Sequence, residues 1–502
     1  MNRSSFNRFA LAALLAAGAM PLSALRTTQA QPPSASQPFT TRIYVQNPNP
    51  NPASGIVNFF DELGSGMPHS VNVPFNLNSN GSTEILIGSL SGLGSPWQGS
   101  AVISADQPVV AASIQVPPSG YGHIMANAFT SGEASDSIFL TTFLAIGNPT
   151  NAVSLFGVQN TEAENVNIRA RFINPTGVTV ADVTLTLPAY TSKFFDGFSP
   201  TSTIANGLHA FNGSVVVTAT KVLGGGPAKL VGIAEERRVE PAGPARFRAY
   251  GFEAIPQSAG AQTIYMPTAL CKSGLGDPTT FFAIQNLSFT NSTVVTVTYA
   301  TGTGTTPTPA TNTLSPLAKW SIDPCQTNNN QTYSGAATIT SSSQPIAAVG
   351  KASQTDPNLP ARYTTAFLAQ ASGASRLAVP YIRWSPPPPV QDFRSFIAIQ
   401  NIGSALIPAG QLTVTYYTQN GSVAANCTSI APMAVGAKLN SNAAGAFFTT
   451  DFNCSPAVDV SSTFIGSAVI QGPSGSSLIA VVRNTTPAAT IQTEDFNAIL
   501  LP

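Results

Sequence analysis

Charged residues are rare in this sequence. It has 22 Lys and Arg and 22 Asp and Glu among 502 residues, or 9%, against about 25% in ordinary soluble domains. The formal net charge is zero, so charge does not direct the protein to nucleic acid or to an acidic membrane surface. Gly (40) and Pro (41) are abundant, and Ser, Thr and Asn fill most polar positions. We therefore expect a neutral surface rich in hydroxyl and amide groups.

The sequence also has few residues suited to catalysis or metal binding. His69, His123 and His209 are the only histidines, and none has ligand spacing or a paired Cys or Glu. The sequence contains no HExxH, no GxSxG, no phosphate-binding glycine loop and no Asp-rich calcium loop. Asp61-Glu62 ends a predicted strand and is interpreted as a turn. We predict no catalytic residue, no metal site and no cofactor, although an enzyme site assembled from loops stays open as a third hypothesis.

The one charge cluster runs from Glu235 to Arg238. We interpret it as a solvated strand edge, with Arg246 and Arg248 as candidate partners.

The N-terminus has the pattern of a secretory signal. Arg3 and Arg8 give a positive start, an apolar run extends from Phe9 to Met20, and Thr28-Gln29-Ala30 is a small-residue cleavage site. The alternative is a retained anchor, but the apolar run is well short of the roughly 20 residues that span a bilayer. We predict a bacterial signal peptide over 1–30, a Pro/Ser/Gln linker over 31–40, and an exported mature chain that begins near Gln31 with no membrane span.

Four cysteines fit an oxidising compartment. Cys271 and Cys325 fall in one stretch of the chain, and Cys427 and Cys454 fall in the next. Four cysteines allow three pairings, of which we favour the two local ones. Each bond would stabilise the fold by roughly 3–4 kcal/mol. A metal site is the weaker alternative, because no CxxC is present.

Three landmarks recur four times in the same order. The first is a strand ending in Gln-Asn, with the Gln at 46, 159, 285 and 400. The second is an aromatic-ended strand near residues 60, 172, 299 and 416. The third is a hairpin that opens with an aromatic residue, one free position and Gly. Its aromatic residues are Trp97, Phe211, Tyr333 and Phe464. Such spacing indicates a fourfold internal repeat.

Within the repeats, apolar and polar residues alternate as in an antiparallel sandwich with one wet face; Val166, Ile168 and Ala170 are an example. Units of about 115 residues with frequent turns favour immunoglobulin-like β-sandwiches over propeller blades of about 40–50 residues. We predict an all-β chain of four tandem antiparallel β-sandwich repeats at 41–143, 144–268, 269–382 and 383–502.

The recurring side chains have structural interpretations. In the Gln-Asn pair, Asn ends a strand and its side chain ties the following turn. The hairpin aromatics are core residues rather than sugar platforms. The hairpin Gly marks a bulge or a close backbone approach.

One strand can be assigned in two ways. A short apolar strand precedes the later Gln-Asn motifs, around residues 138–140, 264–267 and 377–380, and the C-terminal stretch 496–502 is similar to it. In the preferred assignment this strand closes the preceding repeat. The Pro386–Pro389 stretch is then a linker between repeats. In the alternative it opens the following repeat. The first repeat then has a vacant edge, and the C-terminus carries a spare strand for head-to-tail addition.

The signal peptide, the repeats and the low charge together resemble secreted bacterial surface proteins built from tandem immunoglobulin-like sandwiches. The resemblance covers about residues 40–502 and implies an extracellular structural or adhesive role without implying functional residues. We therefore expect a non-enzymatic surface, matrix or filament component. Its partner would be a surface protein, a glycan or a second copy, and no nucleic acid. The alternative is an array of carbohydrate- or protein-binding modules with exposed aromatic side chains on one face.

Overall fold

The computed structural model describes residues 7–11, 39–63, 70–94, 97–116, 123–146, 152–196, 211–239, 247–273, 277–354, 364–385, 394–441, 451–455, 463–485 and 493–501. Within these ranges the chain is all-β and its sheets are antiparallel, as predicted. Three short 3-10 turns interrupt the strands: η1 (Ile87–Ser89), η2 (Gln257–Ala259) and η3 (Pro324–Thr327). No helix in these ranges is long and apolar enough to cross a membrane.

The strands form four two-sheet units, here called units 1 to 4. Unit 1 consists of β1 (Asn7–Leu11), β2 (Thr40–Gln46), β3 (Ala53–Asp61), β4 (Ser70–Leu77), β5 (Ser82–Leu86), β6 (Gly99–Ala105), β7 (Val110–Val116), β8 (Ile124–Asn127) and β9 (Phe129–Thr130). Unit 2 consists of β10 (Ser137–Ile146), β11 (Ala152–Asn160), β12 (Val166–Ile173), β13 (Thr179–Leu187), β14 (Ser192–Asp196), β15 (Phe211–Lys221), β16 (Leu230–Val239), β17 (Phe247–Glu253) and β18 (Ile255–Pro256).

Unit 3 consists of β19 (Thr263–Cys271), β20 (Pro278–Asn286), β21 (Thr293–Tyr299), β22 (Thr303–Gly304), β23 (Ala310–Leu314), β24 (Lys319–Ile322), β25 (Tyr333–Ser341), β26 (Ile346–Gln354) and β27 (Thr364–Leu368). Unit 4 consists of β28 (Arg376–Trp384), β29 (Arg394–Asn401), β30 (Thr413–Thr418), β31 (Val423–Ser429), β32 (Lys438–Ser441), β33 (Phe452–Ser455), β34 (Phe464–Gln471), β35 (Leu478–Thr485), β36 (Thr493–Asn497) and β37 (Ile499–Leu501).

The same pairing order recurs in every unit. One sheet has the order β4-β3-β6-β1 in unit 1 and β31-β30-β34-β28 in unit 4, and the other has the orders β5-β2-β7-β8 and β32-β29-β35-β36. In unit 2 the hairpin between β10 and β11 joins the two sheets. The first strand of each unit therefore pairs with the strand that begins at the aromatic-x-Gly motif (β6, β15, β25 or β34), whereas immunoglobulin domains place their first strand in the sheet with the second. The immunoglobulin-like part of the expectation does not match this strand order.

The strand preceding each Gln-Asn motif belongs to the unit that follows it. β10 pairs with β15, β19 with β25, and β28 with β34. The preferred assignment, in which each of these strands closes the preceding repeat, is therefore wrong. Each expected boundary (143/144, 268/269, 382/383) falls inside one of the strands. The physical reason is that their apolar residues cover the interior of the following unit. The C-terminal strand β37 pairs with β28 of its own unit, so it is not spare. Residues 386–389 lie outside the described residues.

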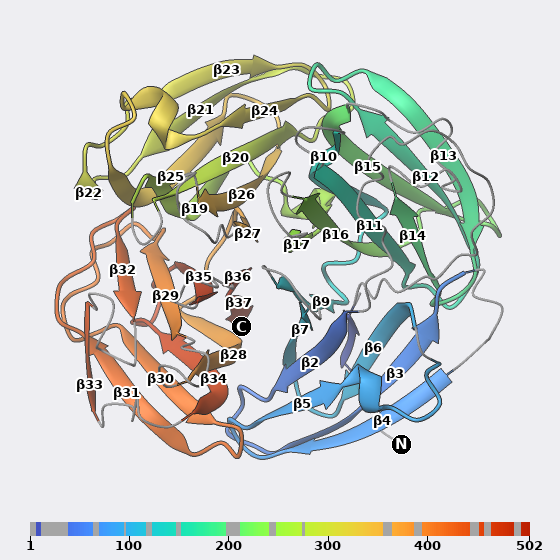
Figure 1. Ribbon diagram of the computed structural model, residues 1–502, viewed down its shortest axis with the longest axis horizontal. Helices are drawn as coiled ribbons and strands as arrows, with labels where there is room; N and C mark the ends of the chain where they lie inside the picture. Colours follow the sequence, from blue (N-terminus) through green and yellow to red (C-terminus); the bar gives the residue numbers. More distant parts are fainter. Residues whose placement is uncertain are drawn as a thin grey trace.

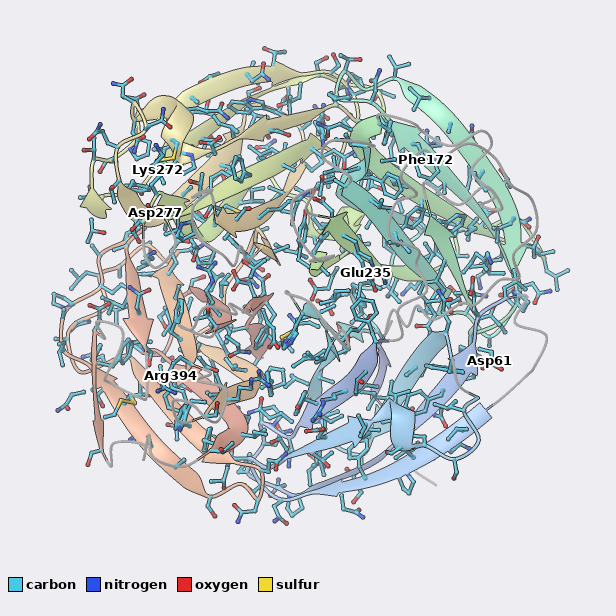
Figure 2. All side chains as sticks on the ribbon, viewed as in Figure 1. Asp61, Phe172, Glu235, Lys272, Asp277 and Arg394 are labelled. Atoms are coloured by element: carbon cyan, nitrogen blue, oxygen red, sulfur yellow. A yellow bond between two sulfur atoms is a disulfide. The ribbon has the colours of Figure 1, made fainter. Side chains whose placement is uncertain are left out.

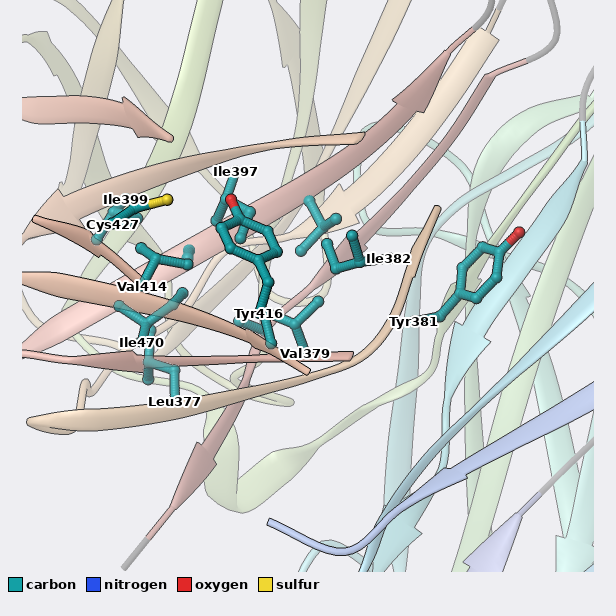
Figure 3. Close-up of a cluster of buried hydrophobic side chains, with 14 of the residues drawn as sticks. Leu377, Val379, Tyr381, Ile382, Ile397, Ile399, Val414, Tyr416, Cys427 and Ile470 are labelled. Carbon is teal, nitrogen blue, oxygen red and sulfur yellow. The ribbon is translucent and has the colours of Figure 1, made fainter. Parts of the chain in front are cut away.

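Alternation of the strands accounts for the interiors. In β12 the side chains of Val166, Ile168 and Ala170 are fully buried, while those of Asn167 and Arg169 are exposed. Figure 3 shows the equivalent cluster in unit 4, where Val414 and Tyr416 of β30 face Ile397 and Ile399 of β29. Each unit thus has its own apolar interior between two sheets.

Both local disulfides are present. Cys271 of β19 is bonded to Cys325 of η3, and Cys427 of β31 is bonded to Cys454 of β33. The pairing predicted from the sequence is confirmed, and each bond lies within one unit.

The four units form a closed ring (Figure 1). Unit 1 contacts unit 2 and unit 4, and unit 3 completes the circle between units 2 and 4. The innermost strands β8, β17, β27 and β36 meet around the axis, each in contact with two others. The contacts between neighbouring units, here called joints, bring together residues far apart in sequence, from 71 positions for Gln285 and Ser214 to 422 for Gln46 and Ala468.

Candidate functional site: the polar joints at the ring axis

The cluster Glu235 to Arg237 lies at the axis and not at a solvated edge. Glu235 and Glu236 are 0% exposed and Arg237 is 6% exposed, and Figure 2 places Glu235 toward the centre of the ring. Arg237 donates to Glu235 from Nη2 at 2.7 Å, and its guanidinium lies over the Phe39 ring of unit 1 at 4.6 Å. Burial raises the pKa of Glu235, and Arg237 opposes that shift. The sequence interpretation of this cluster was wrong because a buried cation of unit 3 completes it.

That cation is Lys351 of β26. Its Nζ lies 2.6 Å from Oε2 of Glu236 and donates to Oγ1 of Thr142 at 3.0 Å. It also lies 5.3 Å from the ring centroid of Tyr250. The ion pair is buried and joins unit 2 to unit 3. A buried pair of this kind costs desolvation, so it specifies partners more than it adds stability.

A second buried pair secures units 3 and 4. Arg483 of β35 holds Asp495 of β36 with two donated hydrogen bonds, from Nε at 2.7 Å and from Nη2 at 2.5 Å. Thr365 of β27 donates from Oγ1 to the same carboxylate at 2.6 Å. Leu368 and Asn497 exchange two further hydrogen bonds across this joint at 2.8 Å. Residues of both units thus donate hydrogen bonds to the carboxylate of Asp495.

The joint between units 4 and 1 contains His123, the one histidine within the described residues. Its Nδ1 contacts Oε1 of Glu494, and Asn484 donates to Oε2 of the same carboxylate at 3.1 Å. Burial acts to raise the pKa of Glu494, but His123 and the charge of Arg383 outweigh it and hold that pKa below its usual value. Glu494 is therefore an ionised anchor.

The ring closes at the axis through Asn127 of β8. Its backbone N–H donates to Glu253 of unit 2, and its side chain donates to the carbonyl of Asn497 in unit 4 at 2.8 Å. Burial raises the pKa of Glu253 to about 7, against the opposing effect of the Asn127 hydrogen bond. This carboxyl changes charge near neutral pH.

Two lysines, Lys319 buried and Lys438 half-buried, form the same kind of contact with a neighbouring unit. Lys319 of β24 donates to Oδ1 of Asn212 in unit 2 at 2.6 Å, and Lys438 of β32 donates to Oγ of Ser334 in unit 3 at 3.2 Å. Both acceptors occupy the free position of the aromatic-x-Gly hairpin. Burial lowers the pKa of Lys319 to about 7 and that of Lys438 to about 8.

The Gln-Asn motif has two structural roles. Each Asn donates from Nδ2 to carbonyl oxygens of two turns at 2.7 to 3.3 Å, and its Oδ1 accepts from the backbone N–H two residues on. This arrangement recurs at Asn47, Asn160, Asn286 and Asn401. The turn interpretation of the Asn is confirmed. The Gln side chains are buried, and two of them reach a neighbouring unit: Gln46 to the carbonyl of Ala468 and Gln285 to Ser214.

The predicted hairpin is wrong as a pair of strands. Its two apolar runs, β6 and β7 in unit 1 and β34 and β35 in unit 4, lie in different sheets and do not pair with each other. The aromatic-x-Gly start of the motif is a packing device. Phe211, Tyr333 and Phe464 are buried, and Trp97 is half-buried with Nε1 donating to Oδ1 of Asp61 at 2.6 Å. A Cβ on Gly213 would lie 2.1 Å from the carbonyl oxygen of Ile173 and 2.2 Å from the Phe211 ring. The aromatic ring therefore folds over the glycine two residues later, as a close approach and not as a sugar platform.

The remaining sequence candidates are structural or lie elsewhere. Glu62 follows β3 and forms an ion pair with Lys193 of unit 2 at 2.7 Å, so the Asp61-Glu62 pair is not a facing acid/base pair. Among the described residues no group of three His, Cys, Asp or Glu could hold a metal ion. His69, His209 and Arg246 lie outside the described residues.

Sequence reasoning did not identify Lys319, Lys351, Lys438, Asp495 or Glu494. Lys351 interrupts the apolar run of β26, and a charge in such a strand is a signal that could have marked it in a chain with so few charges. The short strands of the other four, such as TEDFN of β36, carry no such signal.

The chain matches no family model, no curated protein and no solved structure.

Proposed function

We propose that this protein is an exported, non-enzymatic structural or adhesive component of a bacterial surface or matrix, whose mature chain begins near Gln31. The observation that carries this proposal is where the buried charges lie. Glu236, Asp495 and Glu494 each contact a residue of a neighbouring unit, which suits holding the ring together better than turnover. The two disulfides and the neutral surface suit an oxidising extracellular environment.

The test is expression of the full chain with a C-terminal tag in a bacterial host. We expect export, an N-terminus near Gln31 by intact mass, and ring-sized or assembled particles by electron microscopy. Retention of residues 1–30 in the cytoplasm would contradict export. Saturable turnover of a hydrolase substrate panel, lost in Glu236→Gln, would contradict the non-enzymatic role.

Protein binding is the second candidate. Three aliphatic side chains of unit 4, Leu406, Ile430 and Val435, are exposed by 54% to 62%. They flank the bridge between Ile407 and Met433, which brings their two loops together. By contrast, the exposed phenylalanines among the described residues are Phe281 and Phe289 of unit 3, and Phe289 packs on Phe139 of unit 2. This distribution favours an apolar protein contact over a sugar. A triple Ser variant should lose binding to surface proteins while its glycan-array profile stays blank.

A further inference from the structure

Unit 1 is completed differently from the other units. In units 2 to 4 the outer edge of the strand that begins at the aromatic-x-Gly motif (β15, β25 or β34) is covered by a strand of nine or ten residues: β10, β19 or β28. In unit 1 the same edge of β6 is covered by β1, which has five residues and lies inside the predicted signal peptide. The strand that completes unit 1 is therefore one that export would remove.

The register of β1 is that of the other three strands. The residue four positions after the hairpin Gly pairs with Phe9 in unit 1 and with an apolar residue in each other unit. The four pairs are Ile103 with Phe9, Val217 with Ile138, Ile339 with Ile264, and Ile470 with Leu377. Leu11 likewise pairs with Ala101, where Leu140 pairs with Val215. The edge of β6 thus specifies one register.

The covering strands share an apolar spacing. In each strand, two inward apolar residues lie two positions apart and a bulge follows them. Two further inward residues lie three and five positions after the second of the first two. The sets are Ile138, Leu140, Phe143 and Ala145; Ile264, Met266, Ala269 and Cys271; and Leu377, Val379, Ile382 and Trp384. In the sequence, Phe9, Leu11, Leu14 and Ala16 have the same spacing; the last two lie outside the described residues.

We propose that the outer edge of β6 is an acceptor site for an extended strand of another polypeptide, which replaces β1 in the exported protein. The donor is a segment of eight residues with apolar side chains at its first, third, sixth and eighth positions. Its main chain pairs with β6, and its side chains cover Ala101 and Ile103, which are fully buried in the intact unit. The inference rests on the export proposed above.

Two segments of this chain that could replace the strand are unsuited to it. Residues 31–38 contain three prolines, which lack the backbone N–H that strand pairing needs. β37 is already paired with β28 in unit 4. An open strand edge is normally covered, because its unpaired N–H and C=O groups attract other strands. We therefore assign the donor to another polypeptide.

The register is tested first in the full chain by thiol cross-linking. Ala10 lies opposite Val102 in the pairing of β1 with β6. We expect the pair Ala10→Cys with Val102→Cys to form a disulfide under mild oxidation at least about tenfold more than the diagonal pair Ala10→Cys with Ser104→Cys, because diagonal residues lie about 7–8 Å apart, beyond the reach of a disulfide. The native cysteines are consumed in disulfides. Equal cross-linking of both pairs would overturn the register.

The acceptor is then tested in trans on a chain that starts at Gln31 and carries Val102→Cys. The probes are a peptide of residues 6–16 with Ala10→Cys and a peptide of residues 136–146 with Phe139→Cys. We expect both to cross-link to Val102→Cys, to cross-link weakly to Ser104→Cys, and to fail when the first two inward residues of each peptide are changed to Ser. Absence of register-specific cross-linking would overturn the proposal.

A second format covers the case in which the shortened chain does not fold. A protease site placed in 31–37 of the full chain is cut after folding, and labelled peptide is added. Exchange of the peptide into the cut protein supports the acceptor; no exchange, with the labelled peptide left unbound, overturns it. If the producing cell retains residues 1–30 but the peptides bind, export fails while the acceptor stands.

Discussion

The interiors of the units and the ring axis are buried by opposite chemistries. In the interior of unit 2, Phe172 and Val217 pack among apolar residues of the same unit. At the axis, Lys351 contacts Glu236 across 115 positions of sequence, and Glu494 contacts His123 across 371. Apolar packing is indifferent to which partner covers it, whereas a buried charge requires one particular counter-charge. We infer that the interiors stabilise the units and that the axial pairs select their arrangement.

Breaking an axial pair should have the largest effect. Lys351→Ala leaves the buried Glu236 without its cation, and we expect a loss of about 3–5 kcal/mol in the free energy of unfolding. The double variant Lys351→Met with Glu236→Leu removes both charges and should lie much closer to the natural protein. Urea unfolding measures both. A double variant as unstable as the single one would show that the pair itself stabilises the fold.

Crowding the interior should have the next largest effect. In Gly213→Ala the new Cβ meets the Ile173 carbonyl and the Phe211 ring, and we expect a loss of about 2–3 kcal/mol. Gly226→Ala is the matched control, because nothing lies within 4 Å of its Cβ position. Thermal unfolding compares the two, and equal effects would exclude the close approach as the reason for glycine at 213.

The number of unfolding transitions should also differ between the two kinds of variant. Lys351→Ala at the axis should separate the unfolding of the units into more than one transition, whereas Gly213→Ala should not.

Removing the Asn side chain of one Gln-Asn motif should destabilise the protein less than crowding the interior. Asn160→Ala removes the Nδ2 donor from the carbonyls of Glu164 and Pro188, of which Pro188 keeps the donors of Thr191, and we expect a loss of about 2 kcal/mol in the free energy of unfolding. Asn167→Ala on the exposed face of β12 is the control and should stay within about 0.5 kcal/mol. If chemical denaturation gave the two variants the same midpoint, the hydrogen bonds of the Asn160 side chain would not contribute to stability.

The smallest effect depends on pH. The pKa of Glu253 is raised to about 7 in the folded protein, so its contribution to stability is present below its unfolded pKa and is lost as pH rises through 7. Glu253→Gln keeps an oxygen acceptor for the Asn127 N–H and never ionises. We expect it to stabilise the protein by about 1–2 kcal/mol at pH 8, allowing for the half-buried position of the side chain, and by much less at pH 4.5. A stability difference between variant and natural chain that does not change with pH would remove the proposed role of Glu253.

Lys319 and Lys438 shift stability in the opposite sense. Their folded pKa values are lowered to about 7 and about 8, so the charged form is the penalised one and stability falls as pH decreases through those values. Comparing Glu253→Gln with Lys319→Met over pH 5 to 9 by thermal unfolding should therefore give opposite slopes.

Features that depend on neighbouring residues were predicted well. The Asn turn, the close approach at the aromatic-x-Gly motif and the two disulfides all lie within one unit, and their residue types carry the geometry they need. The predicted hairpin was wrong, because its two apolar runs lie in opposite sheets and only the tertiary structure separates them. The strand at 138–140 was assigned to the wrong unit because its apolar pattern suits either neighbour, and only pairing with β15 decides between them. The cluster at Glu235 was misplaced because exposure of a charge is the ordinary outcome when its partner is not visible in the sequence.

The sequence by itself determined an all-β chain, its fourfold landmarks and its local cross-links, because pleat alternation and turn chemistry act over a few residues. Only the tertiary structure decided that the units close into a ring, that β6 takes a strand from the N-terminal segment, and that the charges lie at the axis. Those outcomes depend on contacts between residues far apart in sequence, from 90 positions for Leu11 and Ala101 to 422 for Gln46 and Ala468, which no local pattern encodes.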